Sequence, residues 1–366
     1  MKSNAKARKS QFPSTATPVV RIGFVPLADA APLIVADQLG MFDAHGVRVE
    51  LQRQVGWATI REKILYREID AAHAPAGLAL SLRLGVHGQN CRSLAPFVMN
   101  LNGNAITLSR DLFERGVRDA RSLLKLIRST PQHLYTFGIV ADLSSHQILL
   151  RLWMESGGIN PDRDVRIVTL PPTQMAGSLS AGLLDGYCVG EPWNSAAIVS
   201  GTGWCPATSE TIAPGHPEKV LLTTEDFAEN RPVEFAAILR ALRDACEYCD
   251  NPKNRKRLTS VMAPAFRHHD DHNLLSLSYV GPFQCGIEQR EAGSFHVFHR
   301  QEANRPSIRR GRWLTENLHR YRILQNRSLA ELQEAMAACW SGDHYDQAMS
   351  QSSLVSPTRT PKSALI

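Results

Sequence analysis

Residues 19–42 read VVRIGFVPLADAAPLIVADQLGMF, and this stretch contains two apolar segments of different period. The first, up to Pro26, is a short apolar run of the kind found in buried strands. The second, from Ala31, has apolar residues at helical spacing, and Gly40 stands where such a helix is expected to end. A strand that leads directly into a helix predicts the opening unit of an α/β domain.

The same alternation continues along the chain. Strand patterns recur at 46–53, 135–142 and 164–171, and helical patterns at 58–69 and 143–162. Repeated alternation of this kind predicts an α/β fold with sheets of the parallel type.

Two segments are expected to carry the chain between two lobes. The stretch 93–109 is strand-like with asparagines in its middle, and 204–224 is extended. A domain that is interrupted by a second one and then resumes has a ligand cleft between its lobes and closes by hinge motion. We predict a disordered basic arm at 1–18, lobe I at 19–104 and 222–340, lobe II at 105–221, and a flexible tail at 341–366.

Charge and cysteine content restrict the class of protein. The 366 residues carry a net charge of +6, concentrated partly in the N-terminal arm and in the run 305–322. The run is interpreted either as a solvated helix face or as a contact for an acidic partner or for nucleic acid. The seven cysteines are odd in number and irregularly spaced, which favours a reducing compartment. The pair Cys246 and Cys249 lies in a helical pattern without a second ligand pair, so two helix cysteines are preferred over a metal site.

The first residues do not have the pattern of a secretion signal. Residues 1–18 contain basic side chains but no apolar run of the roughly 7–15 residues that such a signal needs. No stretch reaches the ~20 apolar residues of a membrane span. We therefore expect a cytoplasmic protein without a membrane segment.

Seven motifs, taken together, resemble the nitrate- and bicarbonate-binding branch of the ABC-transporter substrate-binding family, which has the two-lobed type II periplasmic-binding-protein fold. They occur in the family's order within residues 20–225. The motifs are RIGFVPLADAAPLIVADQLGMF (21–42), GWATIREKI (56–64), LNGNAIT (101–107), GGINPDRDV (157–165), LPPTQM (170–175), DGYCVGEPWN (185–194) and PGHPEKV (214–220).

The resemblance implies one of three roles: an exported binding protein, a binding domain fused to an importer ATPase, or a cytoplasmic nitrate/nitrite sensor of the NasS type. No phosphate-binding loop is present, which argues against the fused ATPase. The sensor is the preferred interpretation, and the substrate-binding protein of a nitrate or bicarbonate importer is the alternative. Such a sensor holds a NasT-type antiterminator with an RNA-binding ANTAR domain and releases it when nitrate or nitrite binds. The sensor itself is not expected to bind nucleic acid.

Nitrate is a planar anion with weak acceptor oxygens, so its site needs several donors, one positive charge and a flat apolar surface. The family motifs offer Lys219 as the charge, although an ordinary surface lysine has the same local pattern. His146 falls in the first turn of a predicted helix, where backbone N–H groups and the helix dipole favour an anion. A histidine that only satisfies the helix start is the alternative.

Trp57 and Asn104 complete the predicted ligand set. Trp57 would supply an indole face and an N–H donor, unless it is a core anchor. The Asn104 amide can donate to an oxygen, and Asn102 is its competitor. Further residues are expected around the site without contacting the ligand: Asn102, Gly103, Ser145, Glu191 and Glu218, with Asp29 at a comparable position.

No chemistry beyond binding is predicted. The sequence contains no nucleophile elbow and no dinucleotide fingerprint. We expect no catalytic residues, no cofactor and no metal.

Overall fold

A computed structural model describes residues 18–350 apart from 87, 267–270, 281–282, 287–288, 291–294 and 325. The predicted basic arm lies outside the described residues except for Pro18, and so does the predicted tail beyond Ser350. None of the helices in the described ranges combines the length and the hydropathy that crossing a membrane requires.

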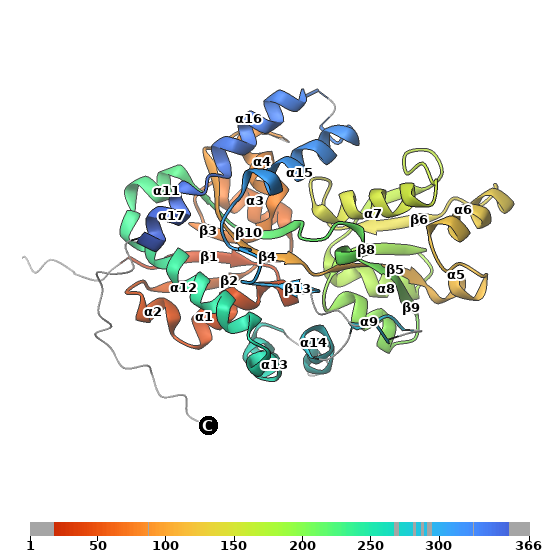
Figure 1. Ribbon diagram of the computed structural model, residues 1–366, viewed down its shortest axis with the longest axis horizontal. Coiled ribbons are helices and arrows are strands. Elements are labelled where there is room, and N and C mark those ends of the chain that lie inside the picture. The colour runs from red at the N-terminus through yellow and green to blue at the C-terminus, as the bar shows by residue number, and fades with distance from the viewer. Residues whose placement is uncertain are drawn as a thin grey trace, which may run out of the picture.

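Two β-sheets lie side by side and form the centres of two lobes (Figure 1). The sheet of lobe I has the strand order β13-β4-β10-β3-β1-β2, and that of lobe II has the order β7-β6-β8-β5-β9. The strands of lobe I are β1 (Val20–Phe24), β2 (Val49–Arg53), β3 (Ala71–Pro75), β4 (Ser93–Asn102), β10 (Pro217–Thr224) and β13 (His296–Val297). Those of lobe II are β5 (Asn104–Ser109), β6 (Thr136–Ile139), β7 (Arg166–Thr169), β8 (Gly186–Gly190) and β9 (Gly203–Thr208).

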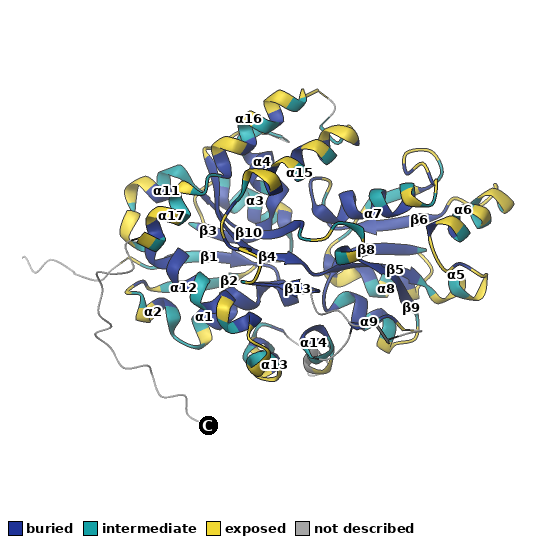
Figure 2. Ribbon diagram, in the orientation of Figure 1, coloured by how far each residue is buried: buried dark blue, intermediate teal, exposed yellow. Residues whose placement is uncertain are grey.

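Helices cover the sheets and turn their exposed residues outward, whereas the strands are largely buried (Figure 2). The helices assigned to lobe I are α1 (Ala31–Gln38), α2 (Met41–Ala44), α3 (Trp57–Leu65), α4 (Ala76–Leu84), α11 (Glu225–Asn230), α12 (Pro232–Asp250), α13 (Arg255–Met262), α14 (Asp271–Tyr279), α15 (Ile308–Arg320), α16 (Leu329–Cys339) and α17 (Asp343–Ser350). Those of lobe II are α5 (Arg110–Glu114), α6 (Ala120–Ser129), α7 (Ser145–Ser156), α8 (Met175–Ser180), α9 (Trp193–Val199) and α10 (Ser209–Ile212).

The prediction of an α/β fold is confirmed, but the sheets are mixed rather than parallel. β1 runs parallel to β2 and β3, and β6 runs parallel to β7 and β8. In contrast, β10 is antiparallel to β3 and β4, and β5 is antiparallel to β8 and β9. The exceptions are strands that enter their sheet from the other lobe, so no right-handed helical crossover sets their direction.

One residue, Gly103, joins the two sheets at the first crossing. It has a φ of 96°, and a Cβ atom at this position would lie 2.5 Å from Nδ1 of His296. Only glycine therefore fits here. The preceding Asn102 also has a positive φ, and its side-chain oxygen accepts a hydrogen bond from Gly215 N, which ties the outgoing crossing to the returning one.

Two predicted boundaries differ from the structure. We expected lobe II to extend to residue 221, but β10 already pairs with β3 from Lys219 onward and with β4 from Pro217. The start of the predicted flexible tail is also wrong, because α17 packs on α12, with Ala348 buried and its carbonyl accepting from Arg240. Both errors have the same cause: the hydrophobic pattern of a short apolar segment does not show which element it packs against.

C-terminal segments bridge the lobes on both sides of the crossings. Cys205 N of β9 donates to Cys285 O, and on the other side Glu155 of α7 accepts from Arg320 and from the Tyr321 hydroxyl at 2.7 and 2.9 Å. Part of the basic run 305–322 is thus structural. Arg310 is another example, because it is buried and donates to backbone carbonyl groups.

Candidate functional site

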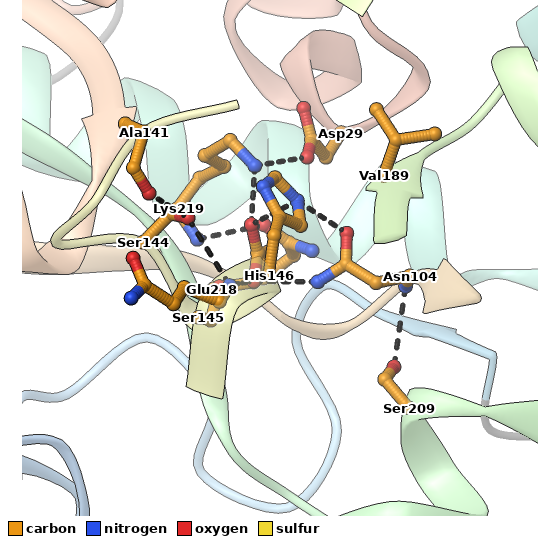
Figure 3. Close-up of polar contacts among 12 residues, drawn as sticks. Asp29, Asn104, Ala141, Ser144, Ser145, His146, Val189, Ser209, Glu218 and Lys219 are labelled. Atoms are coloured by element: carbon orange, nitrogen blue, oxygen red, sulfur yellow. Dashed lines mark hydrogen bonds and ion pairs between the residues drawn. The ribbon is translucent and has the colours of Figure 1, made fainter. Parts of the chain in front are cut away.

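The start of β10 places two charged side chains in the interior between the lobes. Glu218 and Lys219 belong to β10, a central strand of lobe I, and both are completely buried although they are charged. Buried charges of this kind are stable only when they are paired and hydrogen-bonded. Figure 3 shows that polar side chains from both lobes converge on this pair.

The Lys219 ammonium lies between two carboxylates. Its Nζ is 2.8 Å from Oδ2 of Asp29 and also contacts Oε1 of Glu218. It lies 5.6 Å from the ring centroid of Trp57, within the range of a cation–π interaction. Oδ1 of Asp29 accepts from Nε2 of His73 at 2.9 Å, so both carboxylate oxygens of Asp29 are occupied.

Lobe II supplies three further contacts of Glu218. Nδ2 of Asn104 donates to Oε2 at 2.7 Å, and the Ser145 hydroxyl donates to the same oxygen. Nε2 of His146 lies 3.3 Å from Oε1. A carboxylate of lobe I is therefore held by the first turn of α7 and by the first residue of β5.

The amide of Asn104 determines which nitrogen of His146 carries a proton. Because Nδ2 of Asn104 faces a carboxylate, its Oδ1 must face the histidine, and it accepts from Nε2 of His146 at 2.8 Å. Nδ1 of the same ring has no hydrogen-bond partner among the described residues.

Ser144 sets the position of the first turn of α7. Its hydroxyl accepts from Gln147 N as the N-cap and donates to Ala141 O. This cap fixes where the next two residues, Ser145 and His146, present their side chains.

Charge partners shift the pKa values of this cluster. Burial alone would raise the pKa of the carboxyls of Asp29 and Glu218, but the neighbouring Lys219 ammonium outweighs it, and both pKa values lie below their usual range. Burial would lower the pKa of Lys219, but the two carboxylates raise it. All three groups are thus ionised at neutral pH, with one positive charge against two negative ones.

The histidines next to this cluster are neutral. Burial lowers the pKa of His216 to about 4 and that of His296 to about 3. Burial also lowers the pKa of His73. These three imidazoles therefore add no charge to that of the lysine and the two carboxylates.

The structure brings the four predicted ligand residues together. Lys219, His146 and Asn104 share the contacts described above, and Trp57 is the first residue of α3, with its ring 5.8 Å from that of His73. The indole Nε1 of Trp57 is buried and has no partner among the described residues. Asn102 braces the crossing instead, so Asn104 is the asparagine of the cluster.

Two of the residues expected at the periphery, Glu218 and Ser145, belong to the cluster itself. Glu218 lies at the centre of the cluster, as does Ser145. Glu191 stays at the periphery, where its carboxylate accepts from Ser278 of α14 at 3.0 Å. Burial raises the pKa of Glu191, in contrast to Glu218.

His73 and Gly190 were not predicted from the sequence, and Asp29 was expected only at the periphery of the site. A histidine inside the small apolar strand AAHAP signals a buried partner, which is Asp29. Gly190 ends β8 against the cluster, and a Cβ atom there would lie 3.4 Å from both Asn104 Oδ1 and Asp29 Oδ2. Nothing in the local pattern of DGYCVG distinguishes this glycine.

A cavity of about 410 Å³ lies beside the cluster at the edge of the cleft. Residues of α3 and α4 line it from lobe I, and the segments after β6 and β7 line it from lobe II. Trp57 belongs to its wall, together with Leu78, Leu143 and Leu170. Among the described residues, no three His, Cys, Asp or Glu side chains are arranged to hold a metal ion.

Comparisons with known proteins agree with this architecture. A model of the NMT1-like family matches residues 14–263. The nitrate import ATP-binding protein NrtC of Synechocystis sp. PCC 6803 is 38% identical over 82% of this chain and 45% of its own length. The bicarbonate transport ATP-binding protein CmpC of the same organism is 36% identical, with coverages of 82% and 46%. The chain thus spans slightly less than half of these relatives.

The fold also matches solved structures. The crystal structure of the periplasmic nitrate-binding protein NrtA from Synechocystis PCC 6803 superimposes with a TM-score of 0.83 at 22% identity, covering 92% of this chain and 89% of NrtA. At that identity the match shows the fold, which is the two-lobed type II fold expected from the sequence motifs.

Proposed function

Because this chain belongs to the NMT1-like family, whose matching model covers most of lobe I and all of lobe II, we propose that it binds nitrate or nitrite in the cleft between its lobes. The observation that carries the proposal is the convergence of Lys219, Asn104, Ser145 and His146 on one pair of carboxylate oxygens. A planar oxyanion has the same shape and accepts the same hydrogen bonds as a carboxylate.

Each member of the donor set has a defined task in this proposal. Lys219 supplies the positive charge, and the hydroxyl, amide and imidazole donors fix the orientation of the anion. Trp57 provides an apolar surface beside them. Since these donors come from both lobes, the anion favours the closed arrangement of the lobes over an open one.

The anion specificity is tested by thermal unfolding in a panel of salts at constant ionic strength. A ligand that binds only the folded state stabilises it by about 2.7 kcal/mol at a hundredfold excess over its Kd. We expect nitrate or nitrite to raise the melting temperature, and chloride and sulfate to leave it unchanged. A response to bicarbonate alone would assign the chain to bicarbonate binding instead.

The proposed role is that of a cytoplasmic sensor that holds an ANTAR-domain antiterminator and releases it when the anion binds. The support is the resemblance of the sequence motifs to the nitrate- and bicarbonate-binding family, for which a sensor is one of three roles, together with the odd number and irregular spacing of the seven cysteines. In this role the protein acts on transcription only through its partner.

Size-exclusion chromatography of the protein with an ANTAR-domain antiterminator tests this role. We expect one complex without nitrate and two separate proteins with nitrate. Two separate proteins in both conditions would contradict it.

The second candidate function is anion binding for an ABC importer. It is favoured by the relatives, which are named as nitrate import and bicarbonate transport proteins. The two functions share the cleft and differ in the partner, so the chromatography experiment also separates them.

A further inference from the structure

We propose that the Glu218 carboxylate is a tethered competitor of the anion, so that a ligand enters only by displacing Glu218 from the donors. This inference rests on the anion-binding function proposed above and concerns the regulation of the same site.

Glu218 occupies the donors that the proposed ligand requires. Its Oε1 contacts Nζ of Lys219 and lies 3.3 Å from Nε2 of His146. Its Oε2 accepts from Ser145 and from Asn104. A carboxylate presents two oxygens in one plane about a trigonal carbon, much as nitrate presents its oxygens about nitrogen, so both accept from the same set.

The contact crosses the cleft. Glu218 belongs to β10 in the sheet of lobe I, whereas Asn104 is in β5 of lobe II and Ser145 begins α7 of lobe II. All of these side chains are at least 96% buried, so water does not weaken the contacts. Hydrogen bonds to an ionised group are roughly twice as strong as neutral ones. Glu218 therefore holds the lobes together from within.

The negative charges of Glu218 and nitrate prevent both from binding the donors at the same time. Glu218 stays ionised, because Lys219 keeps its pKa below the usual range despite burial. Nitrate has no proton to donate, so placing it beside an ionised carboxylate would add a like charge to a buried site. When Glu218 leaves, Asp29 still pairs with Lys219 at 2.8 Å, so the ammonium stays in position for the ligand.

Glu218→Gln is the informative variant, and Glu191→Gln is its matched control. Both are buried carboxyl groups of the same region, but Glu191 binds Ser278 and none of the four donors. The radius of gyration in the absence of added anion, measured by small-angle X-ray scattering, reports whether the lobes stay closed. Calorimetric titration with nitrate reports the affinity.

We expect Glu218→Gln to increase the radius of gyration and to bind nitrate about tenfold more tightly, which corresponds to ~1.4 kcal/mol. The gain is expected to be smaller for bicarbonate, whose hydroxyl group can donate to the wild-type carboxylate. Glu191→Gln should change neither quantity. Ser145→Ala, which removes one donor and no charge, should also increase the radius of gyration.

Either of two results would overturn the inference. One is an unchanged radius of gyration in both Glu218→Gln and Ser145→Ala. The other is weaker nitrate binding by Glu218→Gln, which would make Glu218 part of the ligand-binding set. If no anion binds to any variant while Glu218→Gln still opens the lobes, the interlobe contact is supported and the oxyanion function is refuted.

Discussion

At the scale of single residues, the site depends on one ammonium group between two carboxylates. Lys219, Asp29 and Glu218 are each at least 99% buried, so none of them can be compensated by water if a partner is lost. Removing one member of a buried ion pair leaves an unpaired charge, which is far more costly than losing an exposed pair.

Lys219→Met is therefore expected to lower the free energy of unfolding by about 3–5 kcal/mol and to abolish anion binding. Urea denaturation measures the first effect and calorimetry the second. Lys125→Met, an exposed lysine on α6, is the control and should change stability by less than about 0.5 kcal/mol. A wild-type denaturation midpoint in Lys219→Met would refute the ion pairs described here.

The buried histidines predict a pH dependence of stability. The pKa of His216 is lowered to about 4, whereas an unfolded histidine titrates near ~6.5. Between these values the unfolded chain binds a proton that the folded chain does not, so stability falls as the pH drops from about 6.5 to 4. For His216 this loss is about 3 kcal/mol.

The variant His216→Gln isolates this contribution. It keeps a donor for Pro217 O, which His216 Nδ1 contacts at 3.2 Å, and removes the titration. Urea denaturation at pH 7 and pH 4.5 should show a smaller loss in the variant than in the wild type. Equal losses would contradict a neutral, buried His216. Asp29 and Glu218, with lowered pKa values, lose their contribution only below about pH 4, which separates the two effects.

At the scale of elements, the start of α7 is the most informative segment. Ser144 caps the helix, and the next two residues contact Glu218. Ser144→Ala should cost about 1 kcal/mol in the free energy of unfolding and should weaken anion binding, because the cap positions the donors. Ser156→Ala at the other end of the same helix is the control. Full anion affinity in Ser144→Ala would mean that the cap does not position the site.

Helix α12 contains a C-x-x-C pair that is not exposed to solvent. Cys246 and Cys249 are completely buried, and burial raises both of their pKa values. Thiols of this kind react slowly, because the thiolate is the nucleophile. We expect Ellman's reagent to label Cys246 and Cys249 only after unfolding, and the half-buried Cys91 earlier than this pair. Rapid labelling of Cys246 or Cys249 in the native chain would contradict the buried assignment of this pair.

At the scale of the whole molecule, the sequence is most informative about order along the chain. The strand-to-helix unit at 19–42 and the recurring alternation predict the α/β fold, because buried strands and amphipathic helices differ in their hydrophobic period. The polar break at Asn102–Asn104 predicts the first crossing. The direction and partners of β10 were not predictable, since strand pairing is a long-range property that local pattern does not contain.

For the candidate site too, the sequence predicted the residues but not the contacts between them. Lys219, His146, Trp57 and Asn104 could be proposed from the motifs, and the structure brings them together. The contacts of Glu218 and Asp29 could not be predicted, because residues 29, 104, 146 and 218 meet only after both crossings are made. The sequence placed Glu218 beside Lys219 at the periphery of the site, and only the geometry shows that its carboxylate contacts Lys219, Asn104 and Ser145.

The most direct test of the account is a calorimetric titration of the purified protein with nitrate, with His146→Ala titrated in parallel. We expect one nitrate per wild-type chain and no measurable binding by the variant, whose fold is checked by its melting curve. Wild-type affinity in His146→Ala, or the absence of heat with nitrate, nitrite and bicarbonate in the wild type, would contradict an oxyanion site in this cleft.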